Sequence, residues 1–264
     1  LVVGTEDGEV CAVDAHSGQD LWRFATGAAE RSSACIIGET LCIGSDDGYL
    51  YALDRRGACL WRFRAGMPIR ATPAICEEHV LFTSMGGFIG AVCLPLPGDE
   101  PTLAWGRSVE RGLIASPVVM ADGRTIATAA LSGDVCAYDC RTGFKRWTRR
   151  LPQAVSATPA AAGPFLFVGA ADGNMRCLDA VDGRPRWRFA LEHQIASSPA
   201  LGHGRLYFGG GDGVLYCLEM EGKPLWWQNT GGPIVCRPAL WRNIVCVGSR
   251  DGAIYGFVDP FVED

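Results

Sequence analysis

The chain has 264 residues, of which 48% are hydrophobic, and its formal net charge is −5. Acidic and basic residues are interspersed without a basic tract, which argues against nucleic acid as a partner. No apolar run approaches the roughly eighteen residues of a membrane-spanning helix, so no membrane segment is expected. The length and composition suit one domain with a large core.

Short apolar runs, separated by Gly, Asp and Pro, predict strands from the first residue onward. The first predicted strands are residues 1–5, 10–14 and 22–24. After an inner strand at 32–37, the next group repeats this order at 41–45, 51–54 and 61–63. The last group has strands at 233–240, 244–248 and 253–258 but no tryptophan strand. The full pattern predicts 26 strands.

Because the chain starts inside a strand, without Met or a signal peptide, we expect a single domain (1–264) taken from a longer protein.

Six tryptophans recur along the chain at intervals of 39, 44, 42, 40 and 39 residues. They are Trp22, Trp61, Trp105, Trp147, Trp187 and Trp226. A period near forty indicates a repeat protein, and four short strands per period indicate one blade of a β-propeller. We expect the indole rings to fill the space between neighbouring blades rather than to bind a ligand.

A tight turn ending in Gly recurs between the second and third strands of each period. Gly is expected there because it reaches positive φ without steric cost. The structural glycines are Gly8, Gly48, Gly133, Gly173, Gly213 and Gly252. With the Gly86-Gly87 turn, seven hairpins predict an all-β propeller of seven four-stranded antiparallel blades. Eight blades are the alternative if a repeat lies outside the chain.

The twelve cysteines lie within apolar strand patterns and show no disulfide framework. Such residues behave as small buried hydrophobes, which favours reduced thiols and a cytoplasmic location.

The run Ala137–Trp147, the Ser/Thr-Pro openings such as Thr72-Pro73 and the Asp-Gly hairpins resemble the repeat of pyrroloquinoline-quinone (PQQ)-like, quinoprotein-type propellers. Within that group the chain is most similar to the C-terminal propeller of the beta-alanine-activating enzyme, in the acyl-CoA synthetase family. The similar stretches are Ser32–Cys35, Cys59–Trp61, Gly86–Val92 and Leu215–Gly222. This resemblance implies a non-catalytic module that accompanies an adenylate-forming enzyme and binds a protein partner or other domains of its own chain.

Two other functions stay open. Quinoprotein dehydrogenases of similar repeat carry adjacent cysteines over PQQ and acidic and Asn ligands for calcium. No two cysteines are adjacent here, so we expect no cofactor, no metal and no catalytic residue, and a PQQ-dependent oxidoreductase is the alternative. A stand-alone scaffold of the outer-membrane-assembly type is the third interpretation, against which the cysteine content argues.

Cationic residues recur where the chain crosses from one predicted blade to the next. They are Arg31, Arg70, Arg111, Arg149 and His193. Together they would suit an anionic ligand or an acidic loop of a partner. The alternative is a solvated rim in which the arginines pair with Asp46, Asp47, Glu110 and Asp251.

Overall fold

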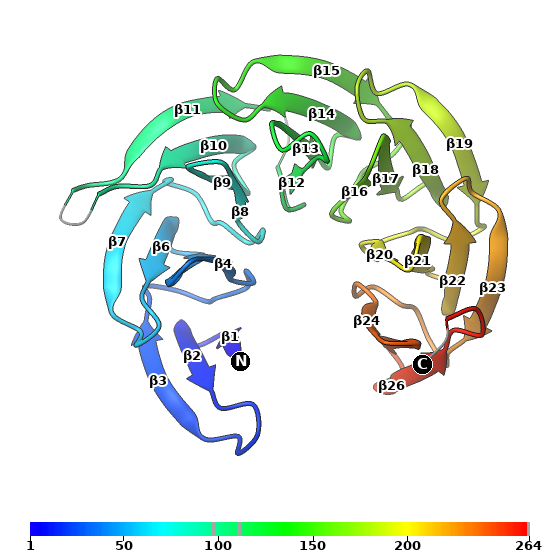
Figure 1. Cartoon of the computed structure of the whole chain (residues 1–264), viewed down its shortest axis with the longest axis horizontal. Helices are drawn as coiled ribbons and strands as arrows, with labels where there is room; N and C mark the ends of the chain where they lie inside the picture. The colour runs from blue at the N-terminus through cyan, green and yellow to red at the C-terminus, as the bar shows by residue number, and fades with distance from the viewer. Residues whose placement is uncertain (97–98, 110–111, 263–264) are drawn as a thin grey trace. The chain divides into compact units, whose positions relative to one another are not determined.

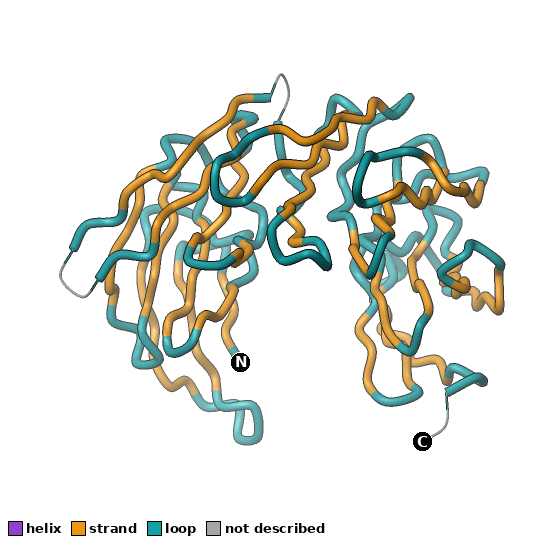
Figure 2. Tube along the Cα trace, turned by 45° about the horizontal axis from the view of Figure 1, so that its top comes forward, coloured by secondary structure: helices purple, strands orange, loops and turns teal. Residues whose placement is uncertain are grey.

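The structure, a computed structural model, describes residues 1–96, 99–109 and 112–262. These residues form 26 strands and no helix, so they contain no helix able to cross a bilayer. The strands form seven antiparallel sheets joined by short loops (Figures 1 and 2). The predicted all-β fold of seven blades is confirmed. Five sheets have four strands, and the first and last have three.

The chain divides into two compact units. One comprises Leu1–Ala130 and Tyr138–Lys145, and the other comprises Leu131–Ala137 and Arg146–Asp264. The boundary falls within the fourth sheet, whose strands are β12 (Val118–Val119), β13 (Thr125–Ala129), β14 (Asp134–Asp139) and β15 (Lys145–Arg150).

The first unit contains three complete sheets. The first sheet has β1 (Val2–Gly4), β2 (Glu9–Val13) and β3 (Asp20–Ala25). The second has β4 (Cys35–Ile37), β5 (Thr40–Gly44), β6 (Tyr49–Leu53) and β7 (Cys59–Arg64). The third has β8 (Ala74–Cys76), β9 (His79–Ser84), β10 (Phe88–Cys93) and β11 (Thr102–Ser108).

The second unit also contains three complete sheets. The fifth sheet has β16 (Ala160–Ala162), β17 (Phe165–Gly169), β18 (Asn174–Asp179) and β19 (Pro185–Ala190). The sixth has β20 (Ala200–Gly202), β21 (Arg205–Gly209), β22 (Val214–Glu219) and β23 (Pro224–Asn229). The seventh has β24 (Ala239–Trp241), β25 (Ile244–Gly248) and β26 (Ile254–Val258).

The first strands of the second and seventh sheets are shorter than the sequence predicted. The predicted strand at 32–37 is observed as Cys35–Ile37, and that at 233–240 as Ala239–Trp241. In the seventh sheet Pro238 directly precedes the strand, and proline has no N–H to donate to a ladder. In the second sheet the Ser32 hydroxyl instead bonds the carbonyl oxygen of Ala71, 3.1 Å away, next to the following sheet.

The predicted hairpin turns lie between the middle strands of the sheets. The six glycines named above adopt φ between 76° and 90°. An acidic residue fixes several of these turns. The Asp47 carboxylate, for example, accepts bonds from the backbone N–H of Tyr49 and the hydroxyl of Tyr51, at 2.9 and 2.6 Å.

A β-bulge precedes the repeat tryptophan in five sheets. In the first sheet Trp22 lies opposite Ala12, Asp20 lies opposite Val13, and Leu21 between them is the extra residue. The same shift occurs beside Trp61, Trp105, Trp187 and Trp226. The residue facing each of these tryptophans is Ala or Cys, which leaves room for the ring on that side of the sheet.

Five of the six repeat tryptophans form a hydrogen bond between the indole N–H and a residue of the next sheet. The Trp22 Nε1–H donates to the carbonyl oxygen of Arg55 at 2.8 Å. Trp105, Trp147 and Trp187 bond the carbonyl oxygens of Cys140, Ala180 and Met220, and Trp226 bonds the Asp259 carboxylate. Four of these rings also lie against the turn glycine that follows. A Cβ on Gly57, Gly143, Gly183 or Gly222 would come within 2.5 to 2.6 Å of the ring.

The hydrophobic core lies between consecutive sheets. Leu50 of the second sheet packs in one cluster with Phe82 of the third. Phe167 and Phe208 share a cluster in the second unit, as do Tyr207 and Val245. The core is therefore a series of similar layers, each of which needs its two flanking sheets.

We predict that Gly183→Ala destabilises the protein by about 3 kcal/mol, against about 1 kcal/mol for Gly18→Ala. Both glycines have positive φ, 70° and 72°, so both variants carry the same backbone strain. Only the Gly183 Cβ would collide with an indole, that of Trp147, whereas nothing lies within 4 Å of a Cβ at Gly18. Urea unfolding measures both free energies.

In a Trp147→Ala background the extra cost of Gly183→Ala should disappear, because the colliding ring is gone. Equal costs for the two glycine variants in the native background would show that the ring contact contributes nothing.

Candidate functional site

Two of the predicted cationic residues, Arg31 and Arg70, lie together in the first unit. The Arg70 guanidinium bonds both carboxylate oxygens of Asp46, at 2.8 and 3.0 Å. The Nε of Arg31 lies 3.4 Å from Oδ2 of Asp46, and its Nη2 lies 3.2 Å from Oε1 of Glu6. Both guanidinium groups therefore have carboxylate partners, the arrangement expected of a paired rim rather than an open anion site.

The other predicted cations have different surroundings. Arg149 lies within β15 instead of on a crossing, and its Nε–H donates to the carbonyl oxygen of Gly183 at 3.0 Å. His193 is exposed in the second unit and lines a depression of about 370 Å³ together with Arg250 and Glu192. Arg111 lies outside the described residues. A ring of cations around one ligand stays a prediction.

Glu30, which the sequence analysis did not single out, is a buried carboxylate on the first crossing. It is 4% exposed, and neither carboxylate oxygen has a hydrogen-bond partner among the described residues. The backbone N–H of Glu30 donates to Thr5, as that of Ile69 does to Ser45 on the next crossing. The corresponding crossing residues are all buried and aliphatic: Ile69, Leu113, Val155, Ile195 and Ile234. An alignment of the crossings would have shown this exception.

Burial, together with the negative charges of Asp47 and Asp46, raises the pKa of Glu30 to about 7. The hydroxyl of Thr26 lies nearby but donates to backbone carbonyl oxygens of Gly8 or Ala28. Near neutral pH, Glu30 is therefore a buried group that changes its charge.

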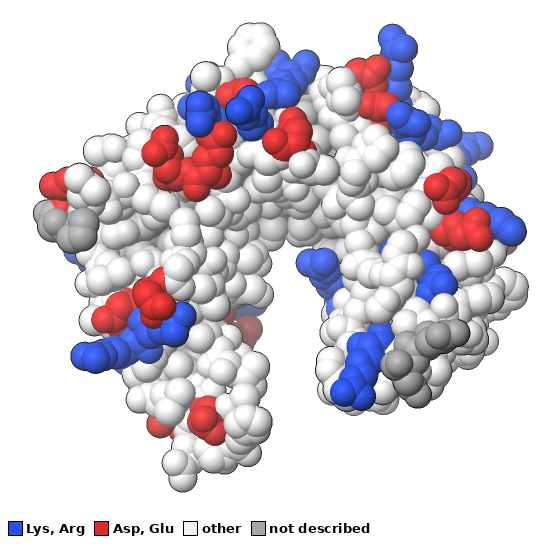
Figure 3. Space-filling model, in the orientation of Figure 1, with Lys and Arg blue, Asp and Glu red and all other residues white. Residues whose placement is uncertain are grey.

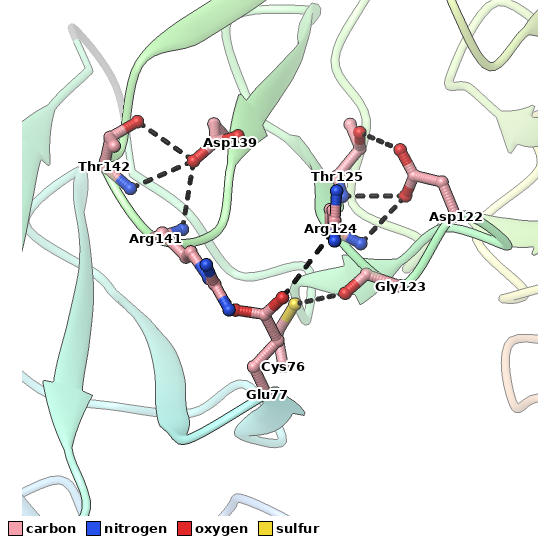
Figure 4. A network of polar contacts seen from close by, with 9 residues as sticks. All are labelled: Cys76, Glu77, Asp122, Gly123, Arg124, Thr125, Asp139, Arg141 and Thr142. Atoms are coloured by element: carbon pink, nitrogen blue, oxygen red, sulfur yellow. Dashed lines mark hydrogen bonds and ion pairs between the residues drawn. The ribbon is translucent and has the colours of Figure 1, made fainter.

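A network of ion pairs and turn bonds joins the third sheet to part of the fourth (Figure 4). This part consists of the β12–β13 hairpin, which contains Arg124, and the turn at Arg141, and both belong to the first unit. Glu77 pairs with Arg141, and its other oxygen lies 3.9 Å from Arg124. Asp139 accepts bonds from the backbone N–H groups of Arg141 and Thr142. The carboxylates are occupied by these donors, so the network fixes the turns.

The described residues offer no metal centre, since no three His, Cys, Asp or Glu side chains among them are grouped to hold an ion. Cys76 and Cys140 interact, but burial raises the pKa of both thiols, which disfavours thiolate chemistry. They are not adjacent in sequence, and the chain has no adjacent cysteines. The residues do not fit the two-cysteine PQQ site.

Comparison with known proteins relates nearly the whole chain to one repeat family. The family described as outer membrane protein assembly factor BamB matches residues 6–93, 99–197 and 176–259. None of the curated proteins matches the chain in sequence.

Two solved structures share the fold. BamB from Moraxella catarrhalis is 18% identical, with a TM-score of 0.66 over 97% of this chain and 93% of that one. The computationally designed Ika8 protein is 15% identical, with a TM-score of 0.69 over 97% and 92%.

We predict that Glu30→Ile stabilises the protein, and more so at pH 8 than at pH 5. The pKa of Glu30 is higher in the folded state, about 7, than its ordinary value of 4.5. The folded state therefore loses stability as pH rises from about 4.5 to about 7, and the loss is complete above that range. The increase in the free energy of unfolding caused by Glu30→Ile should therefore be larger at pH 8 than at pH 5 by roughly 2 kcal/mol.

Denaturant unfolding at both pH values tests this difference. Ile69→Val, at the same position of the next crossing, serves as control and should show the same change at both pH values. An equal gain for Glu30→Ile at pH 5 and pH 8 would mean that Glu30 is not titrating in this range.

Proposed function

Since the chain belongs to the BamB family of repeat propellers, we propose that it is a non-catalytic scaffold that binds other proteins. Figure 3 shows a surface of mixed charge, on which small groups of acidic and basic side chains lie next to one another among uncharged residues. Such a surface suits protein partners better than a polyanion.

Exposed apolar side chains on the outermost strands are the observation that most favours this proposal. The bulge before the repeat tryptophan turns an apolar side chain outward in the first two sheets, where Leu21 is 64% and Leu60 is 52% exposed. Trp227 on β23 is 61% exposed. Large apolar side chains on strands that end a sheet are suited to protein contacts.

A more specific candidate is the accessory domain of an adenylate-forming enzyme of the beta-alanine-activating type. It is supported by the sequence stretches Ser32–Cys35 and Leu215–Gly222. In that case the partner would be the enzyme's own adenylation or carrier domains.

We also propose a cytoplasmic location. All twelve cysteines are free thiols, and seven of them are buried: Cys11, Cys42, Cys76, Cys136, Cys140, Cys177 and Cys217. Free thiols at this density favour a reducing compartment.

A partner-capture experiment tests the scaffold function. We expect the wild-type chain, crosslinked in cells and purified, to retain a defined protein at constant stoichiometry. Leu21→Ser/Leu60→Ser should reduce that yield roughly tenfold without lowering the melting temperature, because both side chains already face solvent. Mass spectrometry identifies the partner and so shows whether it is an adenylate-forming enzyme or a membrane-assembly protein.

Val181→Ser/Phe144→Ser is the matched control, since both side chains are exposed on turns outside the strands. Equal partner loss in the two double variants would refute a role for the outer strands, and no reproducible partner would refute the scaffold.

A quinone titration tests the alternative class. We expect no saturable heat change or absorbance change when PQQ and calcium are added to the reduced protein, because the chain has no adjacent cysteines. Saturable binding at micromolar PQQ would contradict the non-catalytic assignment and favour an oxidoreductase.

A further inference from the structure

A groove of about 720 Å³ lies on the first unit, beside the second sheet. We call it the acid–aromatic groove, and define it by the carboxylates Asp47, Asp99 and Glu100 and the aromatic residues Phe24, Tyr49 and Trp61. Its volume is in the range that holds a small ligand or a few side chains.

The carboxylates of this groove are not neutralised. Within the described part of the chain, Asp47, Asp99 and Glu100 form no ion pair, whereas the adjacent Asp46 is paired with Arg31 and Arg70. Among the described residues, the donors to the Asp47 carboxylate are uncharged and include the backbone N–H of Gly27 at 2.9 Å. Arg62 is the single cation among the described lining residues. The groove therefore carries an excess of negative charge that would attract a cation.

The aromatic wall already holds one cation. The Arg62 guanidinium lies 5.0 Å from the centre of the Tyr49 ring, within the range of a cation–π contact. Tyr49 and Phe24 each lie beside Tyr51, with ring centres 5.9 and 5.5 Å apart. Arg62 thus shows on this chain how a guanidinium is accommodated there.

Trp61 differs from the other repeat tryptophans. The other five donate their indole N–H to the next sheet, but Trp61 makes no such bond to any described residue. The chain that follows β10 contributes the described residues Asp99 and Glu100 to the groove. An indole N–H at the groove wall can donate to a backbone carbonyl of a bound peptide.

We propose that the acid–aromatic groove binds an arginine-containing segment of a partner protein, whose guanidinium displaces that of Arg62 from the Tyr49 ring and lies beside the carboxylates of Asp47, Asp99 and Glu100. Arginine is favoured over lysine because its planar, weakly hydrated guanidinium stacks on aromatic rings. The proposal rests on the scaffold function and specifies the chemistry of the ligand.

The first test measures binding of a fluorescein-labelled arginine–glycine peptide to the whole chain by fluorescence anisotropy. Asp99→Asn/Glu100→Gln should weaken binding roughly fivefold. The control Glu192→Gln/Glu221→Gln removes the same charge from exposed sites outside the groove and should change binding by less than about twofold. Equal weakening in both variants, or no saturable binding, would refute the groove.

The second test depends on a gain of binding, which unfolding cannot produce. Arg62→Ala removes the guanidinium that occupies the Tyr49 ring and should tighten peptide binding about threefold. Arg188→Ala is the control, because Arg188 follows Trp187 in β19 as Arg62 follows Trp61 in β7, and it removes the same charge. Weaker or unchanged binding for Arg62→Ala would overturn the assigned position of the ligand.

The choice of arginine is tested with a lysine–glycine peptide and with Tyr49→Leu. The wild type should prefer the arginine peptide, and Tyr49→Leu should lose that preference at unchanged melting temperature. Partner capture that persists in Asp99→Asn/Glu100→Gln, without peptide binding, would refute the groove and leave the scaffold function in place.

Discussion

The contact between an outer-strand tryptophan and the turn of the next sheet holds neighbouring sheets together. It has two parts, the ring face against a turn glycine and the indole N–H on a turn carbonyl, as Trp147 shows with Gly183 and Ala180. The first part requires a residue without Cβ and the second fixes the ring orientation. Each contact joins residues about 33 to 35 positions apart, so the sheets follow one another at a nearly constant period.

This contact constrains both neighbouring sheets at once. In five sheets the strand bulges just before the tryptophan, and the residue opposite the ring is small, as Ala12 is opposite Trp22. The bulge then places its extra residue on the outside, where Leu21 and Leu60 are exposed. Packing of the core therefore also determines which side chains the outer strands present to a partner.

Most of the fold could be predicted from the sequence, because the features that define a blade are local. The Asp-Gly turns locate the middle strands, and the seventh sheet has a strand at Ile244–Gly248 as expected. The inner strands were overestimated because Ser32 bonds to a neighbouring sheet, which no local pattern reveals. Arg31 and Arg70 lie on crossings, but their ion pairs depend on a turn about fifteen to twenty-four residues away, that of Asp46.

The candidate sites arise where the chain departs from its repeat, and such departures are hard to interpret from sequence because the fold tolerates them. Glu30 replaces a buried aliphatic residue, and the chain after β10 places Asp99 and Glu100 in the groove that Trp61 lines. Asp47 is common to both sites. Its charge raises the pKa of Glu30, and its side chain lines the groove. Ionisation of Glu30 near neutral pH would thus add a negative charge behind the same carboxylate. In a repeat protein each unit packs only against its neighbours. The other layers of the core therefore hold the sheets together even where one repeat contains a buried acid, as at Glu30, or an indole without a bond to a described residue, as at Trp61.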